Sequence, residues 1–152
     1  MNFNLKNKKV LITGSSGGIG SSLSKIFLKM ECKIIFTSSD NNKLNELKNK
    51  FGNENTYYLL NLSDLNSLPS SISKITEENT DIDILINNAG ISKDNLFLRM
   101  KVDQWNEVIN VNLNSNFFIL KSILPNMIKN KKGNIIGITS VVANTGNPGQ
   151  TN

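Results

Sequence analysis

The sequence predicts an α/β fold in which helices cover both faces of a doubly wound parallel sheet. Short β-branched runs alternate with longer amphipathic segments along the 152 residues, a pattern typical of βαβ units. A glycine-rich stretch also joins the first predicted strand to the first predicted helix, where folds of this kind make a tight turn. The length is that of one domain, so we expect residues 1–152 to form a single domain.

Five strands and four helices account for most of the chain. The strands are predicted at 9–13, 33–37, 56–60, 83–87 and 134–139, and the helices at 19–30, 42–50, 63–76 and 102–131. Pro69 either marks the first turn of the third helix or kinks it, and Pro125 should bend the fourth helix near its end. An apolar stripe follows the fourth helix through Trp105, Val108, Ile109, Leu113, Phe117, Leu120, Leu124 and Ile128. The segment 143–152, rich in Gly, Asn and Pro, is predicted to be a loop.

The composition indicates a globular protein and removes several kinds of chemistry. Hydrophobic residues make up 38% and charged residues 19%, near globular averages, and no apolar run is long enough to span a bilayer. Histidine is absent, which excludes Ser-His-Asp and Cys-His nucleophiles and the common His-bearing zinc sites, so no metal is expected. Cys32 is the only cysteine, which excludes an internal disulfide and leads us to expect a reducing, cytoplasmic location.

The net charge of +5 leaves two interpretations open. The lysines are scattered through amphipathic segments without a basic stripe interleaved with aromatic residues, so neither nucleic acid nor a membrane is expected as a partner. A solvated basic surface is the first interpretation. The second is an acidic partner or a phosphorylated ligand.

The stretch from Thr13 to Gly20 predicts a Rossmann-type dinucleotide site. Gly14 would permit the tight turn after the strand, Gly18 the approach of backbone to a pyrophosphate, and Gly20 the close packing of helix on sheet. The N-terminus of the helix would then present N–H groups to phosphate, and Ser15 and Ser16 could add hydroxyl donors. A nucleoside triphosphate loop would end in Lys followed by Ser or Thr, whereas Ile19 and Gly20 stand here.

The end of the second strand bears on the choice of cofactor. An acidic residue there would bind the ribose 2′-hydroxyl and repel a 2′-phosphate. Thr37 and Ser38 are neutral, and Asp40 is better placed to cap the next helix. The sequence therefore favours NADPH.

Several motifs resemble those of the short-chain dehydrogenase/reductase family, and in particular its branch that reduces 3-oxoacyl thioesters of acyl carrier protein. The resemblance covers nearly the whole chain. It is carried by the segments 13–20, 87–91 (Asn-Asn-Ala-Gly-Ile), 94–96, 99–101, 111–113, 138–142 and 146–152. Asn-Asn-Ala-Gly after a strand points to the family, and Gly-Asn-Pro-Gly-Gln points to the branch.

The resemblance implies a set of site residues. The dinucleotide is expected to contact Gly14, Ser15, Ser16, Gly17, Gly18, Ile19, Gly20, Thr37, Asn61, Leu62, Asn88, Ala89, Gly90 and Val111. Thr37 would sit at the 2′-phosphate, and Asn61 and Leu62 would flank the adenine. Of the catalytic residues, Asn112 would organise a water in the proton relay, and Ser140 would orient the substrate carbonyl.

Two departures from the family pattern qualify these implications. Gly17 stands where bacterial reductases often carry an Arg that grips the 2′-phosphate, so NADH stays open as the cofactor. The family's catalytic Tyr and Lys would begin thirteen residues after Ser140, one residue past Asn152. We therefore expect the sheet to be incomplete on its C-terminal side and residues 1–152 alone to be inactive.

The same resemblance implies partners and leaves alternatives. It implies fatty-acid biosynthesis with an acyl carrier protein thioester as substrate, and a homotetramer to which the long helix contributes. Lys129, Lys131 and Lys132 are interpreted either as docking charges near the mouth of the site or as lysines favoured by the helix C-terminus. Another oxidoreductase acting on a 3-ketoacyl or 3-hydroxyacyl coenzyme A, and a non-catalytic nucleotide-binding protein, remain as alternatives.

Overall fold

The computed structural model describes residues 4–152 and contains a five-stranded parallel sheet in the order β3-β2-β1-β4-β5. The strands are β1 (Lys9–Ile12), β2 (Lys33–Ser38), β3 (Thr56–Leu59), β4 (Ile84–Asn87) and β5 (Asn134–Gly137). The chain winds outward from β1 to β3 and then returns to the other side of β1, so the sheet is doubly wound. The predicted fold class is confirmed.

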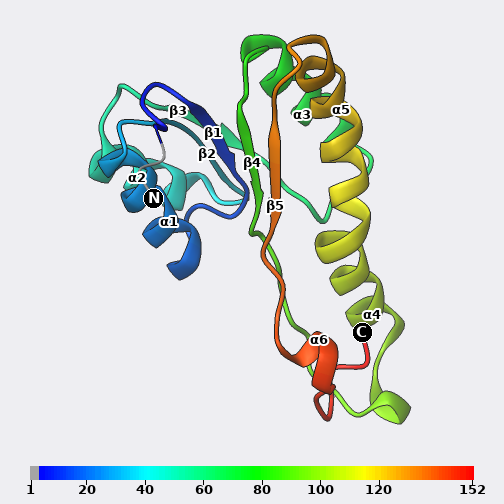
Figure 1. The fold of residues 1–152 in the computed structure, drawn as a ribbon. Coiled ribbons are helices and arrows are strands. Elements are labelled where there is room, and N and C mark those ends of the chain that lie inside the picture. The colour runs from blue at the N-terminus through cyan, green and yellow to red at the C-terminus, as the bar shows by residue number, and fades with distance from the viewer. Residues whose placement is uncertain (1–3) are drawn as a thin grey trace.

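Helices cover both faces of this sheet (Figure 1). The structure contains α1 (Gly18–Lys29), α2 (Asn41–Phe51), α3 (Leu68–Glu78), η1 (Phe97–Arg99), α4 (Val102–Ile109), η2 (Asn110–Asn114), α5 (Ser115–Lys129) and α6 (Val142–Thr145). In Figure 1, α1 and α2 lie to one side of the sheet, and α3 and α5 lie to the other.

Alternation along the strands divides the core into two layers. Val10 and Ile12 of β1 belong to one buried cluster, which Leu47 of α2 also joins. Leu11 belongs to the other cluster, together with Ile72 of α3 and further residues of α5. Because neighbouring strand residues point to opposite faces, a strand buried on both faces must be apolar throughout. The run Val-Leu-Ile of β1 meets this requirement.

The helix predicted over 63–76 begins later, at Leu68. Pro69 lies in its first turn, where the missing N–H costs nothing, so it starts the helix and does not kink it. The preceding residues form a turn around Asp64, whose carboxylate accepts from the N–H groups of Asn66 and Ser67. A side chain that bonds its own backbone competes with helix formation, which explains the late start.

The predicted helix over 102–131 is interrupted in its middle. α4 and α5 are joined by η2, a stretch of π-helix around Asn112. The wider turn shifts the helix face, and the predicted stripe is partly wrong as a result. Leu113, Phe117 and Ile128 are 60–72% exposed. The buried positions of α5 are instead Ser115, Ile119, Ile123 and Met127.

The segment predicted to be a loop contains the short helix α6 and then turns back on the chain. The N–H of Asn95 donates to the carbonyl of Gly149 at 2.8 Å, and Gln150 Nε2 donates to both carboxylate oxygens of Asp94 at 3.1 and 3.0 Å. The segment after α6 is thus fastened to the loop between β4 and α4. Both lie at the far end of the molecule from the connection between α5 and β5 (Figure 1).

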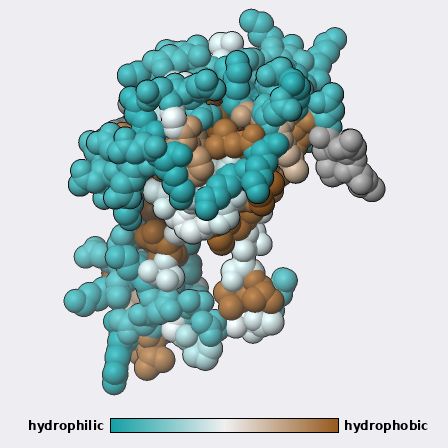
Figure 2. All heavy atoms as spheres, turned by 90° about the vertical axis from the view of Figure 1, so that its left-hand side faces the viewer, coloured by the Kyte–Doolittle hydropathy of each residue, from teal (hydrophilic) through white to brown (hydrophobic). Residues whose placement is uncertain are grey.

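Exposed apolar side chains are distributed unevenly over the surface of residues 4–152. Figure 2 shows apolar atoms gathered in the middle of the face that carries α1 and α2, with hydrophilic side chains around them. Among residues 4–152, β5 pairs with β4 alone, and Ile135 and Ile136 of β5 are 44% and 43% exposed. No helix within these residues is long and apolar enough to cross a membrane.

Candidate dinucleotide site

A cavity of about 420 Å³ opens at the carboxyl ends of β1, β2 and β4. Open α/β sheets bind ligands beyond these strand ends, where the strand order reverses. The cavity is lined by Gly14, Ser16, Gly17, Gly18, Ile19, Gly20, Thr37, Ser38, Ser39, Leu60, Asn61, Leu62, Ser63, Asn88, Ala89, Gly90, Ile91, Glu107 and Val111. Every residue predicted to contact the dinucleotide is in this set except Ser15.

Two of the glycines are required by the packing of the turn itself. Gly14 has φ +62°, and a Cβ there would lie 2.9 Å from Ala89 Cα. A Cβ at Gly20 would lie 2.4 Å from the carbonyl oxygen of Gly14 and 2.8 Å from Ser15 Cα. Gly18, in contrast, has no atom within 4 Å of such a Cβ. The space in front of Gly18 is therefore open for a ligand.

Thr13 fastens the loop that follows β4 to the glycine-rich turn. Its buried hydroxyl accepts from the N–H groups of Asn88 and Ala89, each at 3.0 Å. The side-chain amide of Asn88 in turn donates to the carbonyls of Thr13 and Gly14, at 2.9 and 3.1 Å. The two loops thus form one wall of the cavity.

The N-terminus of α1 faces this cavity without a side-chain cap. Gly17 occupies the N-cap position and offers no side chain to the first N–H groups, whereas the Asp40 carboxylate caps α2 by accepting from Asn42 and Lys43. The predicted capping role of Asp40 is confirmed. Since the first turn of a helix carries unsatisfied N–H groups and a partial positive charge, α1 suits a phosphate.

Ser15 and Thr37 stabilise the turn instead of offering hydroxyls to the cavity. Ser15 is fully buried, and its Oγ donates to the carbonyl of Thr37 at 2.8 Å and accepts from the Thr37 N–H at 2.7 Å. Thr37 is 1% exposed, and its Oγ1 donates to the carbonyl of Ile12 at 3.0 Å. The contact predicted between the Thr37 hydroxyl and a 2′-phosphate would require breaking this bond.

Asn112 and Ser140 lie outside the set of residues that line the cavity. The Asn112 side chain accepts from the N–H of Ile91 and donates to its carbonyl, both at 2.9 Å. It therefore holds the loop after β4 against η2. Ser140 follows β5 and is exposed, with Oγ 3.4 Å from the N–H of Val142. Ser140 lies after the carboxyl end of β5, and Asn112 lies in η2 against the loop that follows β4.

Neither tyrosine of the described residues can serve as the catalytic tyrosine that the family resemblance implies. Tyr57 and Tyr58 lie on β3, at the opposite edge of the sheet from β5. Burial raises the pKa of both, and the hydrogen bond from Tyr58 to Glu78 raises its pKa further. A phenol that donates a proton near neutral pH needs a lowered pKa. Within residues 4–152, no three or more His, Cys, Asp or Glu side chains lie close enough together to hold a metal ion.

Sequence reasoning missed several residues of the cavity wall. These are Ser38, Ser39, Leu60, Ser63, Ile91 and Glu107. Ser38, Leu60, Ser63 and Ile91 each adjoin a predicted residue along the chain, so extending each motif by one position would have found them, whereas Ser39 lies two positions beyond Thr37. Glu107 is one helical turn before Val111 and shares its face. Glu107 pairs with Lys93 at 3.2 Å.

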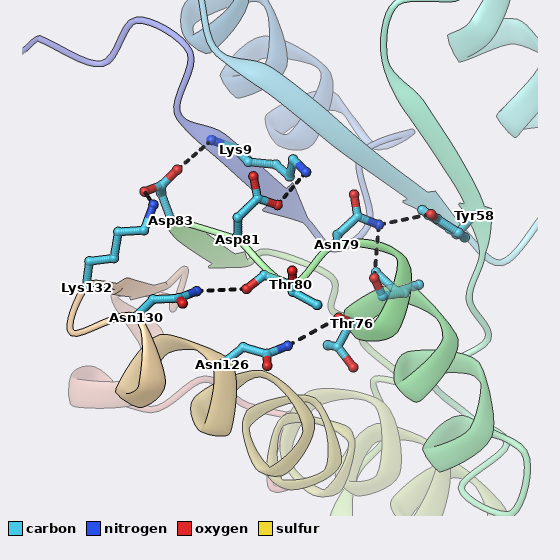
Figure 3. Close-up of polar contacts among 11 residues, drawn as sticks. Lys9, Tyr58, Thr76, Asn79, Thr80, Asp81, Asp83, Asn126, Asn130 and Lys132 are labelled. Carbon is cyan, nitrogen blue, oxygen red and sulfur yellow. Dashed lines mark hydrogen bonds and ion pairs between the residues drawn. The ribbon is translucent and has the colours of Figure 1, made fainter.

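The prediction that the lysines after the long helix lie near the mouth of the site is wrong. Lys132 Nζ lies 2.9 Å from Asp83 Oδ1, and Asp83 directly precedes β4 (Figure 3). Lys132 therefore lies at the amino ends of the strands, opposite the cavity. A helix that runs antiparallel to the strands ends beside their amino ends. The C-terminal lysines of α5 therefore lie away from the site.

The fold and the cavity define a dinucleotide-binding α/β protein, and comparison with known families agrees. The family profile of the short chain dehydrogenases matches residues 8–152, and the chain belongs to that family. The chain is 38% identical over 149 residues to 3-oxoacyl-[acyl-carrier-protein] reductase FabG of Vibrio harveyi and 39% identical to that of Escherichia coli. In both, the match covers 98% of this chain and 61% of the relative.

Solved structures share the same fold. One described as a short chain dehydrogenase/reductase family protein superimposes with a TM-score of 0.88 at 23% identity, over 98% of this chain and 62% of that one. Another, described as ElxO with NADP bound, has a TM-score of 0.83 at 30% identity, over 95% of this chain and 60% of that one. The chain thus spans about three fifths of the length of its relatives.

Proposed function

We propose that the protein reduces a 3-oxoacyl thioester carried on acyl carrier protein, with NADPH as the hydride donor, in fatty-acid elongation. The cavity at the turn between β1 and α1 carries this proposal. Its glycines leave room for a pyrophosphate in front of an uncapped helix, and its walls hold the residues expected to flank the adenosine. The named relatives in Vibrio harveyi and Escherichia coli supply the substrate class.

The residues of this chain would divide the work of binding and orientation. The N–H groups of α1 would bind the pyrophosphate, and Asn61 and Leu62 would flank the adenine. When bound, the reduced nicotinamide supplies the hydride. Ser140 would donate a hydrogen bond to the substrate carbonyl oxygen as negative charge develops on it. Asn112 forms hydrogen bonds with the backbone of Ile91, and it would hold the segment between Ile91 and Asn112 in place.

Nucleotide binding is tested on residues 1–152 by NADPH fluorescence. Gly18→Asp places a carboxylate where the phosphates are expected, at a position with no atom within 4 Å of the new Cβ. An acidic residue in the first turn stabilises a helix, so we expect a melting temperature that is unchanged or slightly raised. The affinity for NADPH should nevertheless fall by more than ~10-fold. Equal affinity in both proteins would contradict the proposed pyrophosphate position.

Catalysis is tested on the gene product that contains these residues. With acetoacetyl-carrier protein as substrate, we expect Ser140→Ala to lower kcat by ~100-fold or more, as the loss of an oxyanion donor does. The control variant is Thr145→Ala, because Thr145 is also exposed and its hydroxyl donates only to neighbouring carbonyls.

Residues 1–152 alone should show no turnover, because the family's Tyr and Lys are not among them. Faster turnover of the coenzyme A thioester would replace the carrier-protein assignment.

A further inference from the structure

We infer that Asp94 is a positioning residue for the proposed reduction, because its hydrogen bond with Gln150 fixes the segment of chain that carries Ser140. This inference rests on the proposed function, in which Ser140 binds the substrate carbonyl oxygen. Asp94 lies in the loop between β4 and α4 and is not among the residues that line the cavity. It therefore acts through the segment and not on a ligand.

Ser140 lies in an exposed arch, residues 139–148, whose two ends attach it to the rest of the described chain. Before the arch, the Ile138 N–H donates to the Asn87 carbonyl at 2.8 Å, and after it the Gly149 carbonyl accepts from the Asn95 N–H at 2.8 Å. Among residues 4–152, the hydrogen bonds of the arch itself reach no further than four residues along the chain. All arch residues except one are exposed, so the two ends decide where Ser140 lies.

The bond from Gln150 to Asp94 is the charged part of the second attachment. Gln150 Nε2 donates to Asp94 Oδ1 at 3.1 Å and to Oδ2 at 3.0 Å. Beside it, Asn152 Nδ2 donates to the carbonyl of Lys93 at 3.1 Å, and the chain end lies next to α4 (Figure 1). A hydrogen bond to an ionised carboxylate is roughly twice as strong as one between neutral groups. Asp94 therefore provides the strongest side-chain contact of this attachment.

The loop that bears Asp94 is itself held against α4 by its neighbouring residues. On one side, Lys93 Nζ pairs with Glu107 at 3.2 Å. On the other side, Asn95 Nδ2 donates to Gln104 Oε1 at 3.2 Å. Glu107 lines the cavity. The second attachment thus holds the arch in a fixed position relative to the helix that forms part of the cavity wall.

The position of the arch matters for the rate because Ser140 must meet the substrate oxygen closely. A donor stabilises the developing negative charge when it lies about 3 Å from that oxygen, and a misplacement of about 1 Å can cost ~100-fold in rate. Without the second attachment, the arch would be held by β5 alone. Asp94 is exposed, so the loss of its bond has little effect on overall stability. Asp94 should therefore affect kcat much more than the melting temperature.

The test exchanges the charge between the two partners in the gene product that contains these residues. Gln150→Glu sets two carboxylates against each other, and we expect kcat for acetoacetyl-carrier protein to fall by ~10-fold or more. Adding Asp94→Asn to Gln150→Glu again places an amide donor opposite a carboxylate, since both substitutions keep the shape of the side chain. This double variant should regain a kcat within ~3-fold of the unchanged protein.

Two further measurements separate positioning from a general structural role. In both variants, the affinity for NADPH should stay within ~2-fold and the melting temperature within ~4 °C. Hydrogen exchange reports the attachment directly, because the Asn95 N–H donates to the Gly149 carbonyl. This N–H should exchange ~10-fold faster or more in Gln150→Glu and regain its protection in the double variant.

The matched control is Asn144→Asp, which adds the same charge to the arch. Asn144 is exposed, and its side chain makes no hydrogen bond within residues 4–152, so kcat and exchange should change by less than ~2-fold. If Gln150→Glu does not fold, Asp94→Ala carries the same test, because it removes the acceptor without adding a charge.

Three outcomes would overturn the inference and leave the proposed function to the test of Ser140→Ala. These are a kcat for Gln150→Glu within ~2-fold of the unchanged protein, a double variant no faster than Gln150→Glu, and unchanged exchange at Asn95 in Gln150→Glu. If the unchanged gene product reduces neither the carrier-protein nor the coenzyme A thioester, the proposed function and the inference fail together.

Discussion

Replacing Gly20 with alanine is expected to destabilise the chain by ~3 kcal/mol or more, the upper range for overpacking a tight interior. The new methyl group would lie 2.4 Å from the Gly14 carbonyl oxygen and 2.8 Å from Ser15 Cα. Both are backbone atoms, so neither can rotate away. Relief requires α1 to move off the sheet, which would also disrupt the bonds from Asn88 to the turn.

The matched control is Gly18→Ala. Gly18 also lies in the first turn of α1, has an ordinary φ, and has no atom within 4 Å of an added Cβ. Alanine there should be neutral or stabilise the helix by up to ~1 kcal/mol. The free energy of unfolding is measured in urea for both variants. Equal stability of the two would show that the close packing of α1 on the turn is not what requires Gly20.

The sequence predicts the parts of the fold that follow from local pattern. Strands such as β1 can be predicted from apolar runs such as Val10-Leu11-Ile12, because a strand that is buried on both faces must be apolar throughout. The structural roles of Gly14 and Gly20 can also be predicted from the sequence. Gly14 adopts a positive φ that few other residues adopt, and Gly20 lies where a helix packs too closely on the turn to leave room for a Cβ. The capping role of Asp40 is readable for a similar reason, since it depends on residues two and three positions away.

Features that depend on tertiary geometry could not be read in this way. The π turn around Asn112 adds a residue to the helix without a sequence signal, so the predicted stripe leaves the buried face at Leu113. The sequence presents the side chain of Thr37 as available to a ligand, but its direction is set by the carbonyl of Ile12 on the neighbouring strand. The position expected for Lys132 is wrong because charge alone does not reveal which strand ends a helix terminus reaches.

Asp83→Asn is expected to cost ~2 kcal/mol of stability at pH 7, the scale of a buried charged hydrogen-bond acceptor. The Asp83 carboxylate accepts from the Lys9 N–H at 3.0 Å and from the ammonium groups of Lys8 and Lys132 at 3.1 and 2.9 Å. Its backbone N–H donates to Lys9, and its carbonyl accepts from Asn134. One residue thus joins the starts of β1, β4 and β5 (Figure 3).

The protonation of this carboxylate gives the prediction a pH dependence. Burial raises the pKa of Asp83, but the hydrogen bonds from Lys9, Lys132 and Lys8 lower it by more, so the pKa lies below that of a free aspartate. A carboxylate whose pKa is lower in the folded state stabilises the fold above its unfolded pKa of about 3.9, and this contribution is lost as the pH falls through the folded pKa. The cost of Asp83→Asn should therefore shrink toward zero in acid.

Urea unfolding at pH 7 and at a series of lower pH values measures this difference, with Asp81→Asn as the control. The Asp81 side chain is 58% exposed where it pairs with Lys9, whereas that of Asp83 is 10% exposed. Because water screens an exposed pair, Asp81→Asn should cost at most ~1 kcal/mol at pH 7. If the two variants lose the same stability at pH 7, the three strand starts are held by their backbone ladder, and Asp83 adds no more than an exposed ion pair.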